Sequence, residues 1–247
     1  MRYKKPLIIF GIILILSGCS DFFMICSLNP FFLEKNVTIV PEIEGNWLAK
    51  TIKPKPASEK EKDEPKVWEL ADTISVWQIK RFISEEKMKT KSGKDSTVIK
   101  PLNFYVASLV GNNPDSAQYH FQLTLFRVNG ALYGDFSPKE VKVISNSRMA
   151  RENYLTVHTL ARIQIQDGQL FVSWLGNEYM REMIEKKRVR IQYRYVQGAG
   201  RLLLTASSND LTDMLDRYAH QKRFIDWENQ PAMMKLTRIN EQSHEKN

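Results

Sequence analysis

Apolar and polar residues alternate along much of the chain after residue 42, and this alternation predicts a mainly β structure. Turn-forming residues and two densely charged stretches, 53–66 and 84–100, separate the expected strands. The stretch 84–100 is expected to contain a turn at Ser92-Gly93-Lys94-Asp95. The expected strands cover residues 43–52, 67–83, 102–110, 119–128, 131–136, 189–196 and 202–205, together with a hairpin inside 155–175.

The clearest local element is a hairpin about Asp167-Gly168, because this dipeptide suits the positive φ angles of a type I′ turn. Folding the chain there places Ile163 opposite Val172 and Ala161 opposite Trp174, so that one face of the strand pair is apolar. The opposite face is mostly polar. The pattern is typical of a strand pair with one side against a core and the other in water.

Two short helices are expected near the C-terminus, at about residues 176–187 and 208–221, where apolar residues recur at helical spacing. Asn177 is a candidate N-cap of the first helix, and Ser207 or Ser208 of the second.

The chain opens with basic residues, a short apolar run from Leu7 to Ile15 and the sequence Leu16-Ser17-Gly18-Cys19. This order is typical of a secretory signal peptide. The tetrapeptide resembles the lipobox of bacterial lipoproteins, which implies cleavage between Gly18 and Cys19, a diacylglyceryl thioether on Cys19 and acylation of the new amino end, with palmitate as the expected chain. An uncleaved membrane helix is disfavoured, since a spanning helix needs roughly 20 apolar residues.

These patterns divide the chain into a signal peptide (1–18), a lipidated N-terminal tether (19–41), a β-barrel-like domain (42–228) and a polar tail (229–247). The formal charge of +8 falls to +5 without residues 1–18, which hold three basic residues and no acidic one. A mild positive balance suits a position near anionic headgroups.

The chain has two cysteines, Cys19 and Cys26. If Cys19 is lipidated, Cys26 has no partner for an intramolecular disulfide, and the domain must be held together by its packed core. The thiol of Cys26 is expected to be inert.

Gly45-x-Trp47 resembles the element that opens the first strand of lipocalins, in which the tryptophan plugs one end of the barrel; a glycine at a strand bend beside a core tryptophan is the alternative. The chain is similar to a group of lipocalin-like lipoproteins of Bacteroidetes. The further motifs of this resemblance are the lipobox, Leu28-Asn29-Pro30-Phe31-Phe32, Leu160-x-Arg162-Ile163 before the hairpin, and Leu203-Leu204-Thr205-Ala206-Ser207-Ser208 before a helix with Leu211. The lipocalin T-D-Y segment and a recognisable closing arginine are not found.

The resemblance implies an antiparallel lipocalin-like barrel, or a strongly curved sheet, with the two helices outside it. It also favours the outer membrane of a bacterial cell envelope as the location, with the periplasmic and surface faces both left open. It brings no catalytic residues.

The sequence indicates no catalytic, cofactor or metal site. The four histidines lack metal-type spacing, although His120 and His158 lie on expected strands and could meet across the sheet. Nucleotide-binding and nucleophile-elbow motifs are missing from the sequence. We therefore expect a protein that is not an enzyme, uses no cofactor and binds no nucleic acid.

Lys186-Lys187-Arg188, Arg190 and Arg194 interleave with Tyr193 and Tyr195. Such a pattern suits anionic lipid, lipopolysaccharide or nucleic acid. The favoured explanation is simpler, because the end of a helix followed by the solvated face of a strand gives the same alternation.

Two functions of different classes fit the sequence. The first is a non-catalytic binding module that holds a small apolar ligand inside the barrel. The alternative is a structural or partner-docking envelope protein with a filled barrel and an exposed aromatic patch. The large residues expected to point inward favour a filled interior; they are Phe121, Leu123, Trp174 and Tyr193.

Overall fold

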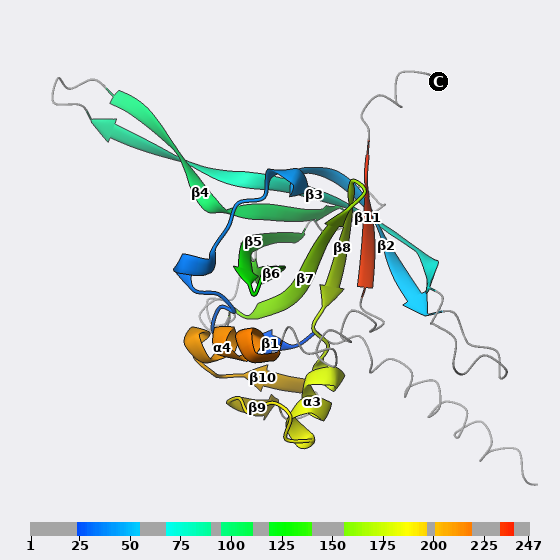
Figure 1. Ribbon diagram of the computed structural model, residues 1–247. Helices are drawn as coiled ribbons and strands as arrows, with labels where there is room; N and C mark the ends of the chain where they lie inside the picture. Colours follow the sequence, from blue (N-terminus) through cyan, green and yellow to red (C-terminus); the bar gives the residue numbers. More distant parts are fainter. Residues whose placement is uncertain are drawn as a thin grey trace, which may run out of the picture.

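The computed structural model describes residues 24–54, 68–89, 95–110, 119–139, 156–196, 201–218 and 233–239. Within these ranges eight strands close into an antiparallel β-barrel, and two short helices lie outside it (Figure 1). The mainly β fold predicted from the sequence is therefore confirmed, and the alternative of an open curved sheet is excluded by the closure.

The barrel is an up-and-down meander in which each strand pairs with the next along the chain. Its strands are β2 (Gly45–Pro54), β3 (Trp68–Lys89), β4 (Asp95–Val110), β5 (Tyr119–Val128), β6 (Ala131–Pro138), β7 (His158–Gln166), β8 (Gln169–Trp174) and β11 (Met233–Arg238). The last strand, β11, pairs with both β8 and β2 and so closes the barrel. Closure pairs edges that would otherwise be open to other chains.

The hairpin of β7 and β8 has the predicted register, with Ala161 opposite Trp174. Its turn residues, Asp167 and Gly168, have φ angles of 51° and 70°, as a type I′ turn requires. Asn129-Gly130 makes a similar turn between β5 and β6, with φ angles of 49° and 77°.

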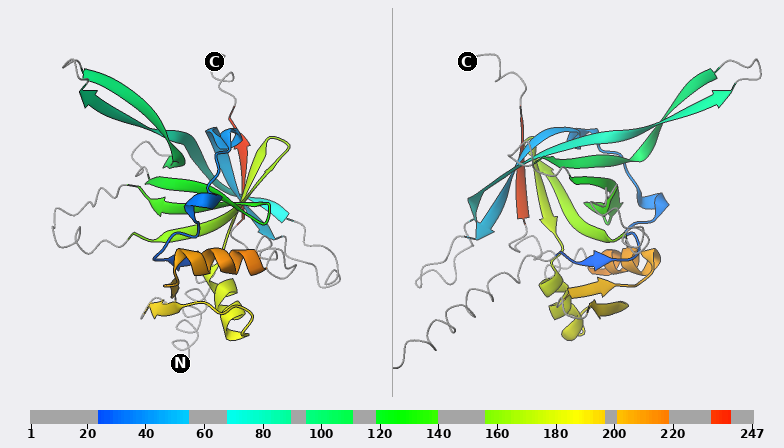
Figure 2. Two further views of the ribbon diagram at one scale, coloured as in Figure 1. Left: turned by 60° about the vertical axis from the view of Figure 1, so that its left-hand side comes forward. Right: turned by 180° about the vertical axis from the view of Figure 1, so that it is seen from behind.

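Strands β3 and β4 continue beyond the barrel as a two-stranded ribbon (Figures 1 and 2). The pairing of β3 with β2 ends at Ile79, and that of β4 with β5 begins at Tyr105. The two strands nevertheless pair with each other as far as Lys89 and Asp95. The strands therefore extend into the charged stretch 84–100, where the sequence suggested only a turn. A ribbon that covers no core has no apolar alternation to reveal it.

A helical module lies between β8 and β11 in sequence and gathers at one end of the barrel (Figure 1). It consists of α3 (Asn177–Glu185), β9 (Tyr193–Val196), β10 (Arg201–Leu204) and α4 (Ser208–Tyr218). Short strand β1 (Cys26–Ser27) joins this module to the barrel, because it pairs with both β7 and β10. The expected helices at 176–187 and 208–221 correspond to α3 and α4.

The helix starts differ in how they are capped. Ser207 caps α4, since its Oγ accepts the N–H of Asp210 at 3.2 Å. Asn177 was expected to cap α3, but it does not. Its Oδ1 instead accepts the N–H of Leu202 at 2.7 Å and so ties α3 to β10. Gly176 occupies the N-cap position, and no side-chain hydrogen bond caps the helix there.

The described part of the expected tether, residues 24–41, packs on the domain. Ile25 and Phe31 are fully buried between the barrel wall and the helical module. Two short 3-10 turns follow, η2 (Glu34–Asn36) and η3 (Pro41–Ile43). This lead-in is therefore part of the folded domain from about Met24 onward.

Residues 229–247 were expected to form a polar tail. They contain strand β11 instead, so this expectation is corrected. Met234 and Leu236 lie on either side of Lys235, and Leu236 is fully buried in the barrel core. Such a short strand holds only these two inward apolar residues, which is too little periodicity to detect in the sequence.

Candidate functional site

The interior of the barrel is the first candidate site, since the sequence suggested a cavity for an apolar ligand there. Its described inward side chains are large and almost fully buried. They include Trp47, Trp77, Tyr105, Leu123, Phe136, Ile163, Val172 and Trp174. Phe136 packs between two of the indoles, with ring centroids 6.1 Å from Trp77 and 4.6 Å from Trp174.

Gly134 on β6 shows how tightly this interior is filled. A Cβ atom at this position would lie 2.8 Å from Cδ1 of both Leu123 and Ile163, and 3.0 Å from the Phe136 ring. Such distances are too short for carbon atoms in van der Waals contact. At this level of the barrel there is no room for one additional methyl group.

Three of the four residues expected to point inward do belong to this core, namely Phe121, Leu123 and Trp174. Tyr193 does not. It lies on β9 in the helical module, where its ring meets that of Tyr195 edge-on at 5.4 Å. Alternation along β9 is the same inside and outside a barrel, so the sequence could not distinguish the two positions.

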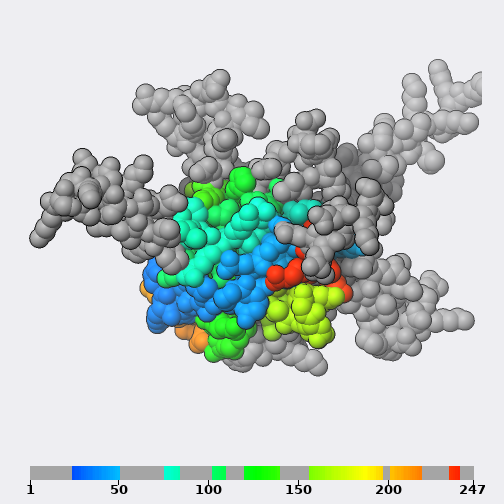
Figure 3. Space-filling view, turned by 90° about the horizontal axis from the view of Figure 1, so that it is seen from above, coloured from blue at the N-terminus to red at the C-terminus, as the bar shows by residue number. Residues whose placement is uncertain are grey.

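Trp47 lies where β2 begins and β11 ends, at the end of the barrel remote from the helical module (Figure 1). Its side chain is 1% exposed, and its Nε1–H donates to the carbonyl oxygen of Ile43 at 2.9 Å. Val40 and Ile43 from the lead-in join the same core. Figure 3 views this end and shows the lead-in and β2, in blue, beside β11, in red.

Arg238 on β11 stacks on Trp47 at this end of the barrel. Its guanidinium carbon lies 4.6 Å from the centroid of the Trp47 ring, and its Nη2 donates to the carbonyl oxygen of Glu42 at 2.8 Å. A Cβ at Gly45 would lie 3.1 Å from Nη1, so the glycine leaves space for this stacking. The arginine escaped notice because its strand fell in the expected tail.

A buried carboxylate on the outer wall of the barrel holds the lead-in in place. Asp135 is 2% exposed. Its Oδ2 accepts the N–H of Phe31 at 2.8 Å, and its Oδ1 lies 2.7 Å from Nδ1 of His158. Both carboxylate oxygens are therefore satisfied within the fold, as burial of a charge requires.

The histidines expected on strands have separate partners. His120 on β5 shares a hydrogen bond of 2.8 Å with Oγ of Ser108 on β4, whereas His158 on β7 binds Asp135 on β6. They do not meet across the sheet. Among the described residues no group of three or more His, Cys, Asp or Glu side chains is placed to hold a metal ion.

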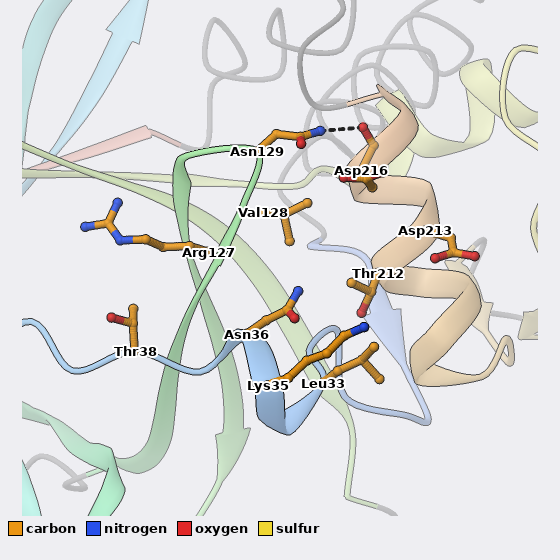
Figure 4. Close-up of a pocket in the computed structure, with 10 residues that line it drawn as sticks. All are labelled: Leu33, Lys35, Asn36, Thr38, Arg127, Val128, Asn129, Thr212, Asp213 and Asp216. Carbon is orange, nitrogen blue, oxygen red and sulfur yellow. Dashed lines mark hydrogen bonds between the residues drawn. The ribbon is translucent and has the colours of Figure 1, made fainter.

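An open groove of about 470 Å³ lies between the lead-in, the β5–β6 turn and α4 (Figure 4). Its charged lining is balanced, with Lys35 and Arg127 against Asp213 and Asp216. Figure 4 shows Lys35 directed toward Thr212, whereas Arg127 points away from α4. Asn129 closes one end by donating to the backbone carbonyl oxygen of Asp216 at 2.7 Å.

The groove therefore differs from the site that the sequence suggested. It lies outside the barrel, and its lining is polar and charged, which suits a polar or zwitterionic group better than an apolar ligand. No sequence motif marks it, because its residues come from three segments that are far apart in the chain.

The basic run after α3 is exposed. Lys187, Arg188, Arg190 and Arg194 all reach solvent, and Lys186 forms an ion pair with Glu182 one helical turn away. Tyr195 is 52% exposed. The favoured explanation of a helix end followed by a solvated strand thus agrees with the exposure of these side chains.

Gly18 and Cys19, the expected cleavage and lipidation residues, lie outside the described ranges. Within the described residues, no helix has the length and apolar character needed to cross a bilayer. Comparison of the chain with protein-family models, with curated proteins and with solved structures gives no match.

Proposed function

We propose that this protein is a lipid-anchored lipoprotein of the bacterial cell envelope that acts as a structural or partner-docking module. The tight packing of the described side chains inside its barrel is the observation that carries the proposal. Trp77, Phe136 and Trp174 occupy the space that a ligand would need, and Gly134 has no room for a methyl group. A barrel filled in this way acts through its outer surface.

The proposed anchor is Cys19, and its support is the Leu16-Ser17-Gly18-Cys19 sequence. Anchoring needs two or three acyl chains to be stable, and a lipoprotein amino end carries that number. The membrane is thus the first proposed partner, with the outer membrane favoured by the lipocalin-like resemblance.

The ribbon of β3 and β4 is the proposed surface for a second partner, another envelope protein. An isolated two-stranded ribbon is marginally stable in water, so its length is easiest to understand if it contacts a partner. At its base Phe82 stacks on Phe104 with ring centroids 5.0 Å apart, and Nζ of Lys139 lies 3.5 Å from the Phe82 centroid. Ile83 beside them is 53% exposed.

The proposal includes that the protein catalyses no reaction. This part rests on the lack of a catalytic motif in the sequence and on the engagement of His120 and His158 in hydrogen bonds along the barrel wall. A carrier of small apolar ligands, which the sequence also suggested, would need space in the barrel, and it becomes the competing outcome of the test below.

The test is native mass spectrometry of the protein purified from its own membrane. We expect the mass of residues 19–247 with acyl chains on Cys19 and no additional small molecule. An apolar fluorescent probe should bind the Phe136→Ala variant, in which a cavity replaces the ring, and should not bind the wild-type barrel. A small apolar molecule released from the wild-type protein on denaturation would overturn the docking proposal in favour of a carrier.

A further inference from the structure

The small sheet of β1, β10 and β9 has one face against the core and one face toward solvent. Cys26 lies opposite Leu203, which lies opposite Arg194, and Arg201 lies opposite Val196. Residues paired directly across a sheet, and residues two apart along one strand, share a face. These five residues therefore form one face, here called the cationic face.

The burial of the side chains shows which way this face points. Leu202 and Leu204, on the opposite face of β10, are 2% and 0% exposed and belong to the core. Arg194, Arg201 and Val196 are exposed, and Val196 retains 43% of its surface. The cationic face is consequently the outer one.

The chemistry of the cationic face matches a lipid headgroup layer. Two guanidinium groups flank apolar Val196 and Leu203, and the three strands contain no Asp or Glu. Arginine forms strong bidentate contacts with phosphate oxygens, and the apolar residues between the arginines favour the boundary of the acyl region.

The position of the cationic face in the chain also favours a membrane. Met24 bridges to Gly176 at the edge of the helical module and is 38% exposed. Cys19 precedes Met24 by five residues, so the lipidated residue lies within about 17 Å of it even in a fully extended chain. A domain held on so short a connection keeps this end close to the bilayer.

We propose that the cationic face lies against the anionic lipid headgroups of the membrane that holds Cys19. This inference rests on the proposed lipid anchor and adds an orientation to it. The helical module is then the membrane-proximal end, and the ribbon of β3 and β4, which projects from the other end (Figure 2), points away from the bilayer toward its partner.

Thiol accessibility in reconstituted vesicles tests this orientation. The acylated protein is prepared with Cys26→Ser and either Val196→Cys on the cationic face or Ile83→Cys at the base of the ribbon. Each variant is reconstituted into phosphatidylcholine vesicles with or without phosphatidylglycerol and treated with a water-soluble maleimide. We expect phosphatidylglycerol to slow labelling at position 196 severalfold and to leave position 83 unchanged.

Charge variants give a matched control. Replacing Arg194 and Arg201 by Gln should remove most of this protection at position 196, because each basic residue near an anionic surface strengthens binding by about fivefold. Replacing Lys50 and Lys80, on the barrel wall, by Gln removes the same net charge and should retain the protection. High salt should have the effect of the arginine variants.

The outcomes separate the two proposals. Acyl chains on Cys19 with equal labelling at position 196 in both vesicles would overturn the orientation and leave the anchor standing. Protection at position 83 in place of position 196 would also overturn the orientation. A purified protein without acyl chains would overturn both. Hydrogen exchange of the β9 and β10 amides in the acylated wild-type protein tests the same orientation without an introduced cysteine. Equal exchange rates in the two kinds of vesicle would also overturn the orientation.

Discussion

The backbone N–H of Phe31 donates to Oδ2 of Asp135 at 2.8 Å, so that a carboxylate on the barrel wall binds the segment that leads in from the proposed membrane anchor. Phe31 itself is fully buried. The lead-in is thus held by both a charge-assisted hydrogen bond and an apolar side chain. This contact fixes the lead-in against the barrel wall.

Asp135→Asn should destabilise the fold by about 1–3 kcal/mol, because an amide cannot serve both Phe31 and His158 with the strength of a carboxylate. Urea unfolding measures the loss, and hydrogen exchange should show faster opening of residues 25–31 than of β7. Asp213→Asn on the exposed face of α4 is the control and should change stability by less than about 0.5 kcal/mol. Equal effects of the two substitutions would contradict a clamp at Asp135.

Arg238→Ala should cost about 1–2 kcal/mol, through loss of the cation–π contact with Trp47 and of the hydrogen bond to the Glu42 carbonyl oxygen. The stability of Arg238→Lys should lie between those of Arg238→Ala and the wild type, since lysine keeps the charge and loses the planar stacking. Tryptophan fluorescence during denaturant unfolding gives both values. Lys80→Ala, at an exposed position of β3, is the control. If it lowers stability as much as Arg238→Ala does, the contacts of Arg238 with Trp47 and Glu42 do not stabilise the barrel.

Gly134→Ala should destabilise the barrel by about 1–3 kcal/mol, because its methyl group would meet Leu123 and Ile163 at 2.8 Å. In a background with Leu123→Val and Ile163→Val the two Cδ1 atoms are gone, and the same glycine substitution should cost less. Gly176→Ala is the control, since no atom lies within 4 Å of its added Cβ. If Gly134→Ala leaves the stability of the barrel unchanged, the interior has free space beside Gly134.

Stability should fall at alkaline pH through Tyr105. Burial raises the pKa of its phenol above the ordinary value of 10.0, and its hydroxyl oxygen accepts the N–H of Val40 at 2.8 Å. A raised pKa in the folded state means that stability is complete below pH 10 and is lost as the pH rises toward the folded value, since the unfolded chain ionises first.

Tyr105→Phe tests this by removing the titrating group. The variant should be less stable by about 1–3 kcal/mol near neutral pH, because the buried N–H of Val40 loses its acceptor. Above pH 10 the difference from the wild type should shrink. Free energies of unfolding across this range measure both effects, and parallel curves for the two proteins would refute the assignment.

The sequence predicted those parts of the fold whose pattern is local. The hairpin about Asp167-Gly168 was predicted to the residue, because a type I′ turn fixes the register of the strands beside it. The spans of α3 and α4 followed from apolar residues at helical spacing.

The parts that escaped prediction depend on tertiary contacts. The inward apolar residues of β11 are Met234 and Leu236, and the strand is recognisable only from its partners, β2 and β8. The clamp at Asp135 joins residues about 100 positions apart, and the groove beside α4 collects three distant segments. Neither has a sequence signature, because the residues share no period and no motif.

The closing contact between Arg238 and Glu42 spans 196 residues, and that between Ser27 and Leu204 spans 177. Pairings of such long range carry a large loop-closure entropy and make folding slow. Neither contact can form until almost the whole chain is present. A partly synthesised polypeptide therefore cannot complete the barrel or seat its lead-in. For the exported lipoprotein proposed above, this delay would keep the chain unfolded, as passage through a membrane requires. The native state is reached only after the C-terminal strand arrives.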